Sequence, residues 1–340
     1  MKAPAFWTVS EGREAAPLVR ALLSPLAAIY AWAGARRLRT APSRQLPVPV
    51  ICVGNLTLGG TGKTPVAQYL LQRLKTLGAA PFALSRGYGG SEKGPLRVDP
   101  AHHGAAEVGD EPLLLAQAAA AIISRDRPAG GELAVSEGAS VIVMDDGHQN
   151  PSLAKTLSIL VVDGQTGWGN GRVFPAGPLR EPVAAGLSRA DAVIVMMPDG
   201  ERAPDYRGLG LDELEIPVLH AWLKASAPPP DGPLIAFAGI GRPEKFYDAL
   251  SAAGGNIIDT CSFGDHHAFG EGELKYMFAL AARHGAELVT TEKDWVRLPR
   301  HARERIACWP VEAAFAQPAV LDGLLQRVVD ASDENAKPLA

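Results

Sequence analysis

The chain has 340 residues, of which 47% are hydrophobic and 21% are charged. This composition excludes an intrinsically disordered chain and supplies apolar residues for about two domains of roughly 100–200 residues each. The net charge of -4 argues against a dedicated nucleic-acid-binding protein. The three cysteines are widely separated and form no CxxC pair, so they predict neither a disulfide framework nor a zinc site. This cysteine pattern fits a reducing compartment.

Near the N-terminus, fifteen uncharged residues separate Arg20 from Arg36, and further arginines follow. A membrane-spanning helix needs about 20 apolar residues, so this stretch is short for a crossing. Its aromatic residues, Tyr30 and Trp32, and the flanking arginines favour a helix over about 17–35 that lies on a membrane surface. The alternative is a helix packed on or buried in the main domain.

From position 48 onwards, short apolar segments alternate with segments of helical periodicity. Strands are expected at 48–53, 81–84, 140–144, 157–162, 192–197 and 218–222, and helices at 65–77 and 111–123. Apolar strands joined by crossovers of this length are typical of a parallel sheet with helices on both faces. The sequence therefore predicts an α/β fold.

A proline-rich break, ASAPPPDGP at 225–233, interrupts this pattern and has the composition of a linker. The alternation then resumes with strands expected at 234–238, 256–263 and 286–290 and helices at 243–253, 270–284 and 318–330. We therefore expect a first domain over residues 1–228, a smaller α/β domain over 229–330 and a disordered tail over 331–340.

A glycine-rich phosphate loop follows the first strand of the large domain. Its residues are Thr57, Leu58, Gly59, Gly60, Thr61, Gly62, Lys63 and Thr64, which match the pattern GxxxxGK[ST] except for Thr57 in place of the first glycine. Glycines let backbone N–H groups approach phosphate oxygens, and the N-terminus of the next helix attracts negative charge. We assign Lys63 to the β- and γ-phosphates of a nucleoside triphosphate and the Thr64 hydroxyl to Mg²⁺.

Two other classes of phosphate-loop protein fit the sequence less well. Guanine-specific proteins carry an NKxD motif, and the nearest segment here, 291–294, has its lysine directly beside its aspartate. Membrane-cycling ATPases of the MinD type have a lysine where this chain has Leu58. A membrane-cycling nucleotide switch and a soluble small-metabolite kinase stay open as alternatives, because a phosphate loop alone does not define the reaction.

Acidic residues and a histidine are the candidates for catalysis. Asp145 and Asp146 end an apolar strand, where the second half of a Mg²⁺ site is expected, and only one of them should contact the ion directly. Asp110 precedes an apolar helix and is either its N-cap or a general base for an attacking hydroxyl. His266 follows a strand in FGDHHAF and either orients a catalytic carboxylate or belongs to a surface turn in which Asp265 caps the helix.

Further polar residues are candidates for binding the substrate. Arg86 follows another strand end, and Arg180 and Glu181 lie in the long irregular segment NGRVFPAGPLREP at 170–182. Arginines in such loops bind phosphate groups well, because their guanidinium groups donate several hydrogen bonds. Asn55, at the start of the phosphate-loop segment, completes this set.

Seven motifs occur together in a fixed order along the chain. They are GNLTLGGTGKTP (54–65), SRGYGG (85–90), VGDEP (108–112), DDGHQ (145–149), FPAGPLREP (174–182), FGDHHAF (263–269) and TTEKD (290–294). In this set, over residues from about 15 to 325, the chain resembles the tetraacyldisaccharide 4'-kinase family. The resemblance implies a phosphate-loop kinase fold.

The resemblance also implies an activity and a location. The family transfers the γ-phosphate of ATP, with Mg²⁺, to the 4'-hydroxyl of a tetraacyldisaccharide 1-phosphate, which forms lipid IVA in lipid A biosynthesis. It further implies a peripheral enzyme on the cytoplasmic face of the bacterial inner membrane, attached through its N-terminal helix. No nucleic-acid partner is implied.

The motifs carry roles to individual positions of this chain. By resemblance, Asp110 matches the family's general base and His266 matches its partner. The metal-binding group is Thr64, Asp145 and Asp146, the phosphate-loop lysine is Lys63, and the residues near the acceptor are Arg180 and Glu181. No role is assigned to His148 or to the TTEKD segment.

Overall fold

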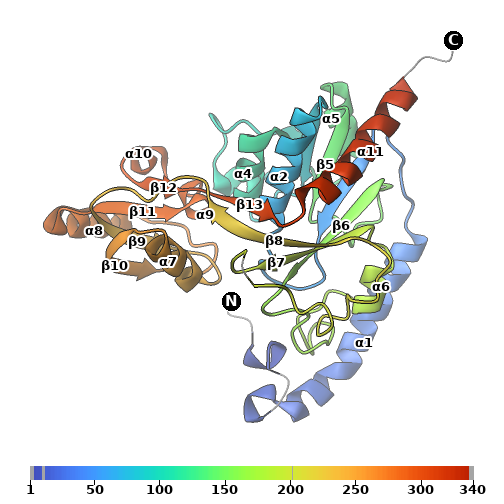
Figure 1. Ribbon diagram of the computed structural model, residues 1–340, viewed down its shortest axis with the longest axis horizontal. Coiled ribbons are helices and arrows are strands. Elements are labelled where there is room, and N and C mark those ends of the chain that lie inside the picture. Colours follow the sequence, from blue (N-terminus) through green and yellow to red (C-terminus); the bar gives the residue numbers. More distant parts are fainter. Residues whose placement is uncertain (1–3, 10–11, 201, 337–340) are drawn as a thin grey trace.

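A nine-stranded sheet forms the larger part of the protein (Figure 1). The computed structural model describes residues 4–9, 12–200 and 202–336. In spatial order the strands are β13 (Val311–Phe315), β8 (Val218–Ala225), β7 (Ala192–Met197), β6 (Leu157–Asp163), β1 (Val50–Gly54), β5 (Val141–Asp145), β2 (Pro81–Ser85), β4 (Ala120–Ile123) and β3 (Leu96–Arg97). All neighbours pair in parallel except the outermost pairs, β13 with β8 and β3 with β4, which are antiparallel.

Helices cover both faces of this sheet, as the apolar strands require. One face carries α2 (Lys63–Thr76), α4 (Asp110–Ala118), which follows the short α3 (Ala105–Val108), and α11 (Pro318–Ala336). The other face carries α5 (Arg127–Ser136) and α6 (Val183–Leu187). In α2, the buried residues Val66, Leu70 and Leu74 recur at helical spacing, so one side of this helix enters the core.

A second, four-stranded sheet forms a smaller α/β domain beside the first (Figure 1). Its parallel strands are, in order, β10 (Asn256–Ser262), β9 (Pro233–Ala238), β11 (Glu287–Thr291) and β12 (Ala307–Trp309). One face packs against α7 (Pro243–Ala252), and the other packs against α8 (Glu271–His284) and the region of α9 (Glu292–Trp295) and α10 (Arg300–Arg303).

The chain returns to the large sheet after the second domain. β13 joins the edge of that sheet beside β8, and Leu321 and Leu325 of α11 are fully buried in the same apolar cluster as α2. An ion pair of 2.7 Å between Arg73 of α2 and Asp322 of α11 fixes this contact. The expected boundary at 228 lies between β8 and β9, but residues 311–330, expected in the smaller domain, complete the larger one.

Two expected elements differ in the structure. The single helix predicted at 111–123 is wrong, because α4 ends at Ala118 and β4 begins at Ala120. The alanine-rich sequence favours helix locally, but parallel pairing with β2 and burial of the strand override that propensity. The last helix extends to Ala336, so residues 331–336 of the predicted disordered tail are helical, while 337–340 lie outside the described residues.

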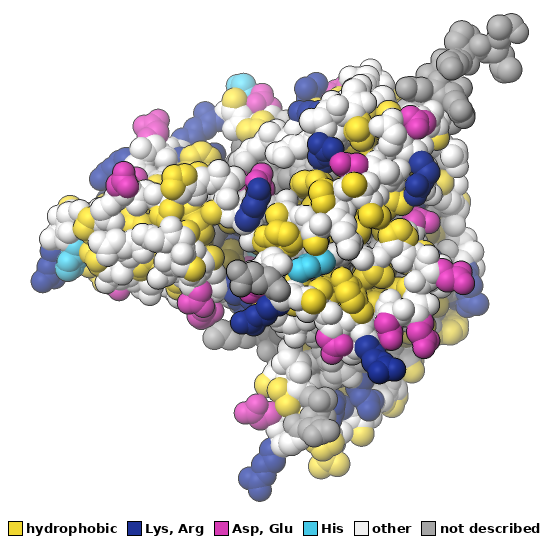
Figure 2. Space-filling model, viewed as in Figure 1, with side chains coloured by type: hydrophobic (Ala, Val, Ile, Leu, Met, Phe, Trp, Pro, Cys, Tyr) yellow, Lys and Arg dark blue, Asp and Glu magenta, His cyan; other side chains and the backbone are white. Residues whose placement is uncertain are grey.

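The N-terminal helix α1 (Pro17–Thr40) has 24 residues and is longer than the expected 17–35. Within this fully described helix only Ala27 is buried, while Leu18 and Leu22 are 85% and 78% exposed. Residues 13–40 are long and apolar enough to cross a membrane by length and composition, which corrects the expectation that the segment is too short. α1 rises from the bottom of the molecule along its lower right side (Figure 1), and apolar and basic side chains both appear on that part of the surface (Figure 2).

Candidate active site

The phosphate loop lies at the carboxyl edge of the large sheet, between β1 and α2, as the sequence predicts. β1 is flanked by β6 and β5, and the β5 register places Asp145 opposite Val53 at the start of the loop. Gly62 has a φ of 86°, and a Cβ at this position would lie 3.2 Å from the Met196 side chain. The backbone at the start of α2 therefore requires glycine.

Two neighbouring segments hold the phosphate loop in shape. The amide of Asn55 is buried and donates to the carbonyl oxygen of Thr57 at 2.8 Å, so this candidate for substrate binding braces the loop from within. From the 170–182 segment, the carbonyl of Pro178 accepts from the Leu58 N–H at 2.8 Å. The adjoining N–H of Arg180 donates to the carbonyl of Leu56 at 2.7 Å, which brings this arginine beside the loop.

Asp146 links the loop lysine to this arginine. Its carboxylate lies 3.7 Å from Lys63 Nζ and accepts from Arg180 Nη1 at 2.8 and 2.9 Å. Burial opposes the ionisation of Asp146, but the charges of Lys63 and Arg180 hold its pKa below the ordinary value. Arg180 Nε is buried without a hydrogen-bond partner in the described part of the chain, so the two bonds to Asp146 are the ones that hold this guanidinium beside the loop.

Asp145, the neighbouring residue, has the opposite environment. It is 1% exposed, and neither carboxylate oxygen has a hydrogen-bond partner among the described residues. Burial, together with the charge of Glu111, raises the pKa of Asp145 to about 7, although Lys63 acts in the other direction. An unpaired carboxylate at this depth fits the oxygen-ligand chemistry of Mg²⁺, and Thr64, at the start of α2, supplies a hydroxyl at the same edge.

The remaining candidates for substrate binding occupy two different environments. Glu181 is buried, and Arg189 Nη2 donates to its two oxygens at 2.7 and 2.8 Å, while Gln149 adds a third bond at 2.9 Å. Glu181 thus braces the segment behind Arg180 and presents no free oxygen to a ligand in this arrangement. The side chain of Arg86, by contrast, is exposed directly after β2.

The second group of site residues is centred on Asp110 and joins the two domains. Gly109, with a φ of 89°, is the N-cap of α4, so the interpretation of Asp110 as the N-cap is wrong. Asp110 Oδ2 lies 3.2 Å from His266 Nδ1, 3.9 Å from Lys293 Nζ and 3.0 Å from Arg297 Nε, and it also accepts from Arg297 Nη2. All three partners come from the second domain.

These contacts determine the ionisation of Asp110. Burial by itself raises the pKa of this carboxyl, yet the hydrogen bond with His266 and the charges of Lys293 and Arg297 bring it well below its ordinary value. His266 has a left-handed φ of 58°, and its N–H donates to the carbonyl of Gly239 at 3.1 Å. The turn geometry therefore directs this imidazole across the domain boundary, whereas His267 bonds to Glu273 within its own domain at 2.9 Å.

Four charged residues of the site were not among the sequence candidates: Arg127, Glu111, Lys293 and Arg297. Arg127 begins α5, is buried, and donates to the backbone carbonyl of Asp145 at 3.2 Å. An arginine shortly after a strand end would have marked Arg127 as a candidate. The strand end at 123 was hidden, because residues 111–123 were expected to form a single helix. Glu111 follows Asp110 in the VGDEP motif, and Arg297 lies three residues beyond TTEKD, where only the fold reveals its contact with α4.

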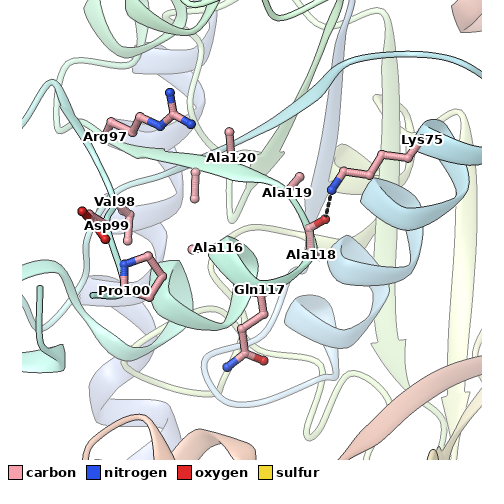
Figure 3. Close-up of a pocket in the computed structure, with 11 residues that line it drawn as sticks. Lys75, Arg97, Val98, Asp99, Pro100, Ala116, Gln117, Ala118, Ala119 and Ala120 are labelled. Atoms are coloured by element: carbon pink, nitrogen blue, oxygen red, sulfur yellow. Dashed lines mark hydrogen bonds between the residues drawn. The ribbon is translucent and has the colours of Figure 1, made fainter. Parts of the chain in front are cut away.

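A cavity of about 650 Å³ lies elsewhere, beside β3 and β4 (Figure 3). Lys75 and Arg97 line it, but none of the site residues described above does. Lys75 Nζ donates to the carbonyl of Ala118 at 2.5 Å, and Arg97 donates to Glu137 at 2.9 Å. Both cations are therefore engaged within the protein.

Comparison with known proteins assigns the chain to one family. The family model described as tetraacyldisaccharide-1-P 4'-kinase matches residues 19–330. The tetraacyldisaccharide 4'-kinase of Maricaulis maris is 61% identical over 97% of both chains, and that of Hyphomonas neptunium is 52% identical over 96% of this chain and 97% of its own. The crystal structure of LpxK from Aquifex aeolicus in complex with ATP superposes with a TM-score of 0.73 at 27% identity, covering 92% of this chain and 99% of that one. The chain therefore belongs to the tetraacyldisaccharide-1-P 4'-kinase family.

Proposed function

We propose that this protein transfers the γ-phosphate of ATP to the 4'-hydroxyl of a tetraacyldisaccharide 1-phosphate, which forms lipid IVA in lipid A biosynthesis. Membership of the kinase family supports the reaction. One observation supports the assignment of roles to residues. Asp110 and His266 form a carboxylate–histidine pair across the two domains, beside the phosphate loop and the buried Asp145. Asp110 begins α4, and α4 packs against α2, the helix that follows the phosphate loop: Gln68 of α2 donates to the carbonyl of Leu114 of α4 at 3.0 Å.

The phosphate loop and Lys63 bind the triphosphate of ATP. Backbone N–H groups at the start of α2 face the phosphates, and the Lys63 ammonium neutralises charge on the β- and γ-phosphates. Thr64 and Asp145 would hold Mg²⁺, which neutralises phosphate charge when it is bound. Asp146 orients Lys63 and Arg180 through its two ion pairs, so the adjacent aspartates have separate roles.

Asp110 acts as the base for the sugar hydroxyl, with His266 holding its carboxylate. Its lowered pKa makes Asp110 a weak base. Phosphoryl transfer nevertheless has a loose transition state that requires little early proton removal, so the position of the carboxylate matters more than its basicity. A general base typically contributes 10²–10⁴-fold, and we expect Asp110→Ala to lose about this much turnover while it stays folded. A folded variant with near-wild-type turnover would exclude this role.

The acceptor lipid binds along the surface that α1 and the 170–182 segment form together. The Tyr30 and Phe174 rings are 5.5 Å apart, and Arg172 Nη1 donates to Ser24 Oγ at 3.2 Å, so the middle of α1 contacts this segment. These contacts favour a helix that stays beside the domain, in the membrane surface. Acyl chains would lie along the apolar side chains of α1, while Arg172 and Arg180 would bind phosphate.

The proposed location is the cytoplasmic face of the bacterial inner membrane, with the protein as a peripheral enzyme. The basic residues of α1 suit an anionic lipid surface, and its exposed leucines supply apolar area for insertion. Recovery of the full-length protein in the high-salt supernatant of washed membranes would count against this location.

The direct test incubates the protein with γ-labelled ATP and a tetraacyldisaccharide 1-phosphate and then follows the label. Label should appear in the glycolipid, in an amount that depends on Asp110. Deletion of residues 1–35 should reduce phosphorylation of the acylated acceptor more than hydrolysis of ATP. Label that is released only as inorganic phosphate would instead indicate a nucleotide switch.

A further inference from the structure

Arg297 is held by the second domain and reaches across to the first. Its side chain is 6% exposed, and Nη1 donates to the carbonyl of Gly239 at 2.9 Å and to Asp294 Oδ1 at 3.0 Å. Nε and Nη2 of the same guanidinium donate to Asp110 Oδ2. The planar group is therefore fixed on one side by its own domain, so that its other side defines where the Asp110 carboxylate lies.

The TTEKD segment builds the position that Arg297 occupies. Asp294 is fully buried, and Thr291 Oγ1 both donates to Asp294 Oδ2 at 2.7 Å and accepts from the Asp294 N–H at 3.1 Å. Thr290 Oγ1 donates to the carbonyl of Phe237 in the adjacent β9 at 2.7 Å. Threonine hydroxyls thus tie the segment to the sheet, and its last aspartate orients the arginine.

Arg297 also controls the hydrogen bond of His266. Arg297 Nη2 lies 3.2 Å from His266 Nδ1, which is itself 3.2 Å from Asp110 Oδ2. The imidazole Nδ1 either donates to Asp110 or accepts from Arg297, since one nitrogen cannot do both at once. On the other side of the ring, Lys293 Nζ lies 3.5 Å from Nε2. The arginine therefore influences both members of the Asp110–His266 pair.

We propose that Arg297, fixed by Asp294 and the Gly239 carbonyl, is a positioning residue that sets the orientation of the Asp110 carboxylate for phosphoryl transfer. The inference rests on the proposed role of Asp110 as the base. Within the described residues, the hydrogen bonds of Arg297 reach no residue of the phosphate loop. Its effect is therefore on catalysis and not on nucleotide affinity.

The first test compares Arg297→Met with Arg297→Lys under saturating lipid acceptor. The methionine variant should lower kcat about 10–100-fold, the range for loss of hydrogen bonds to a charged group, with the KM for ATP within about twofold of wild type. The lysine variant should recover part of kcat, because an ammonium retains the charge but not the planar fork. Unchanged kcat in a folded methionine variant would overturn the proposal.

Arg303→Met is the matched control. Arg303 lies in the same domain, is half-buried, and donates to the carbonyls of Leu298 and Val296 at 2.9 and 2.6 Å without contacting Asp110. Its variant should keep kcat within about threefold of wild type at matched fractions of folded protein. If Arg297→Met does not fold, the lysine variant decides: lowered kcat at unchanged ATP KM supports the proposal, and unchanged kcat overturns it.

A double-mutant cycle with Asp110→Asn separates this inference from the proposed function. If Arg297 acts through Asp110, the double variant should have the same kcat as Asp110→Asn alone. Losses that multiply would overturn the positioning role of Arg297 and leave Asp110 as the base. Near-wild-type kcat in Asp110→Asn would instead reject the proposed base, and the role of Arg297 with it.

Discussion

The adjacent residues Asp145 and Asp146 should respond to the same substitution in opposite ways. Asp145 is fully buried and lacks a hydrogen-bond partner among the described residues, whereas Asp146 binds Arg180 at 2.8 Å and lies 3.7 Å from Lys63. Replacement by asparagine removes the charge and keeps the shape. We therefore expect Asp145→Asn to stabilise the protein without nucleotide and Asp146→Asn to destabilise it.

The magnitude for Asp145 follows from its environment. Its pKa rises from 3.8 to about 7 on folding, so the folded state prefers the proton. Protonation of Asp145 therefore contributes its full stabilisation to the wild-type protein below about pH 4, and this contribution is lost as the pH rises to about 7. At 1.36 kcal/mol per unit this gives at most about 4 kcal/mol at pH 8. This bound already includes the attraction of Lys63 and Arg127, and the asparagine amide would itself be buried without hydrogen-bond partners, so we expect a gain of about 2 kcal/mol.

The assay is thermal unfolding at pH 8 with a chelator and without nucleotide. A gain of about 2 kcal/mol corresponds to a Tm increase of roughly 4–8 °C for a domain of this size class. Asp146→Asn should lose about 1 kcal/mol after allowance for solvent screening. Both variants should lose kinase activity. A Tm for Asp145→Asn at or below that of wild type would refute the argument that this carboxylate is held unpaired at a cost in stability.

Four further predictions concern other parts of the molecule. Gly62→Val should abolish ATP binding in titration calorimetry while the circular dichroism spectrum stays native. The φ of 86° at Gly62 disfavours a side chain, and a Cβ there would lie 3.2 Å from Met196, so retained affinity would contradict this prediction. Lys63→Met should lower kcat about 10²–10³-fold, measured with saturating ATP, and a smaller loss would remove it from the γ-phosphate. Leu22→Glu combined with Ile29→Glu should release the protein from anionic vesicles in sedimentation without changing ATP hydrolysis; undiminished binding would exclude the face of α1. Asp322→Ala should lower the unfolding free energy by about 0.5–1 kcal/mol in a denaturant titration, since it removes the 2.7 Å ion pair with Arg73. No change would show that this pair does not stabilise the packing of α11 on α2.

Local sequence was sufficient for the elements that depend on local rules. The strand, glycine-rich loop and helix around Gly59–Thr64 are confirmed, because glycine content and helical periodicity act over a few residues. The parallel sheet, the smaller α/β domain and the family also followed from apolar segments and ordered motifs. The position of Asp145 at a strand end placed it at the sheet edge, and the register confirmed this location.

Amino-acid composition and hydrophobic periodicity could not determine which distant segments of the chain lie in contact. Pairing with β2 turned the alanine-rich residues 120–123 into a strand, and burial against α2 returned α11 to the first domain. Only the packing of the two domains placed Arg297 on Asp110, 187 residues apart in the chain. Propensity and periodicity are local, whereas the contacts of a buried charge depend on every element packed around it, so the sequence determined the parts of this site and the tertiary structure decided their partners.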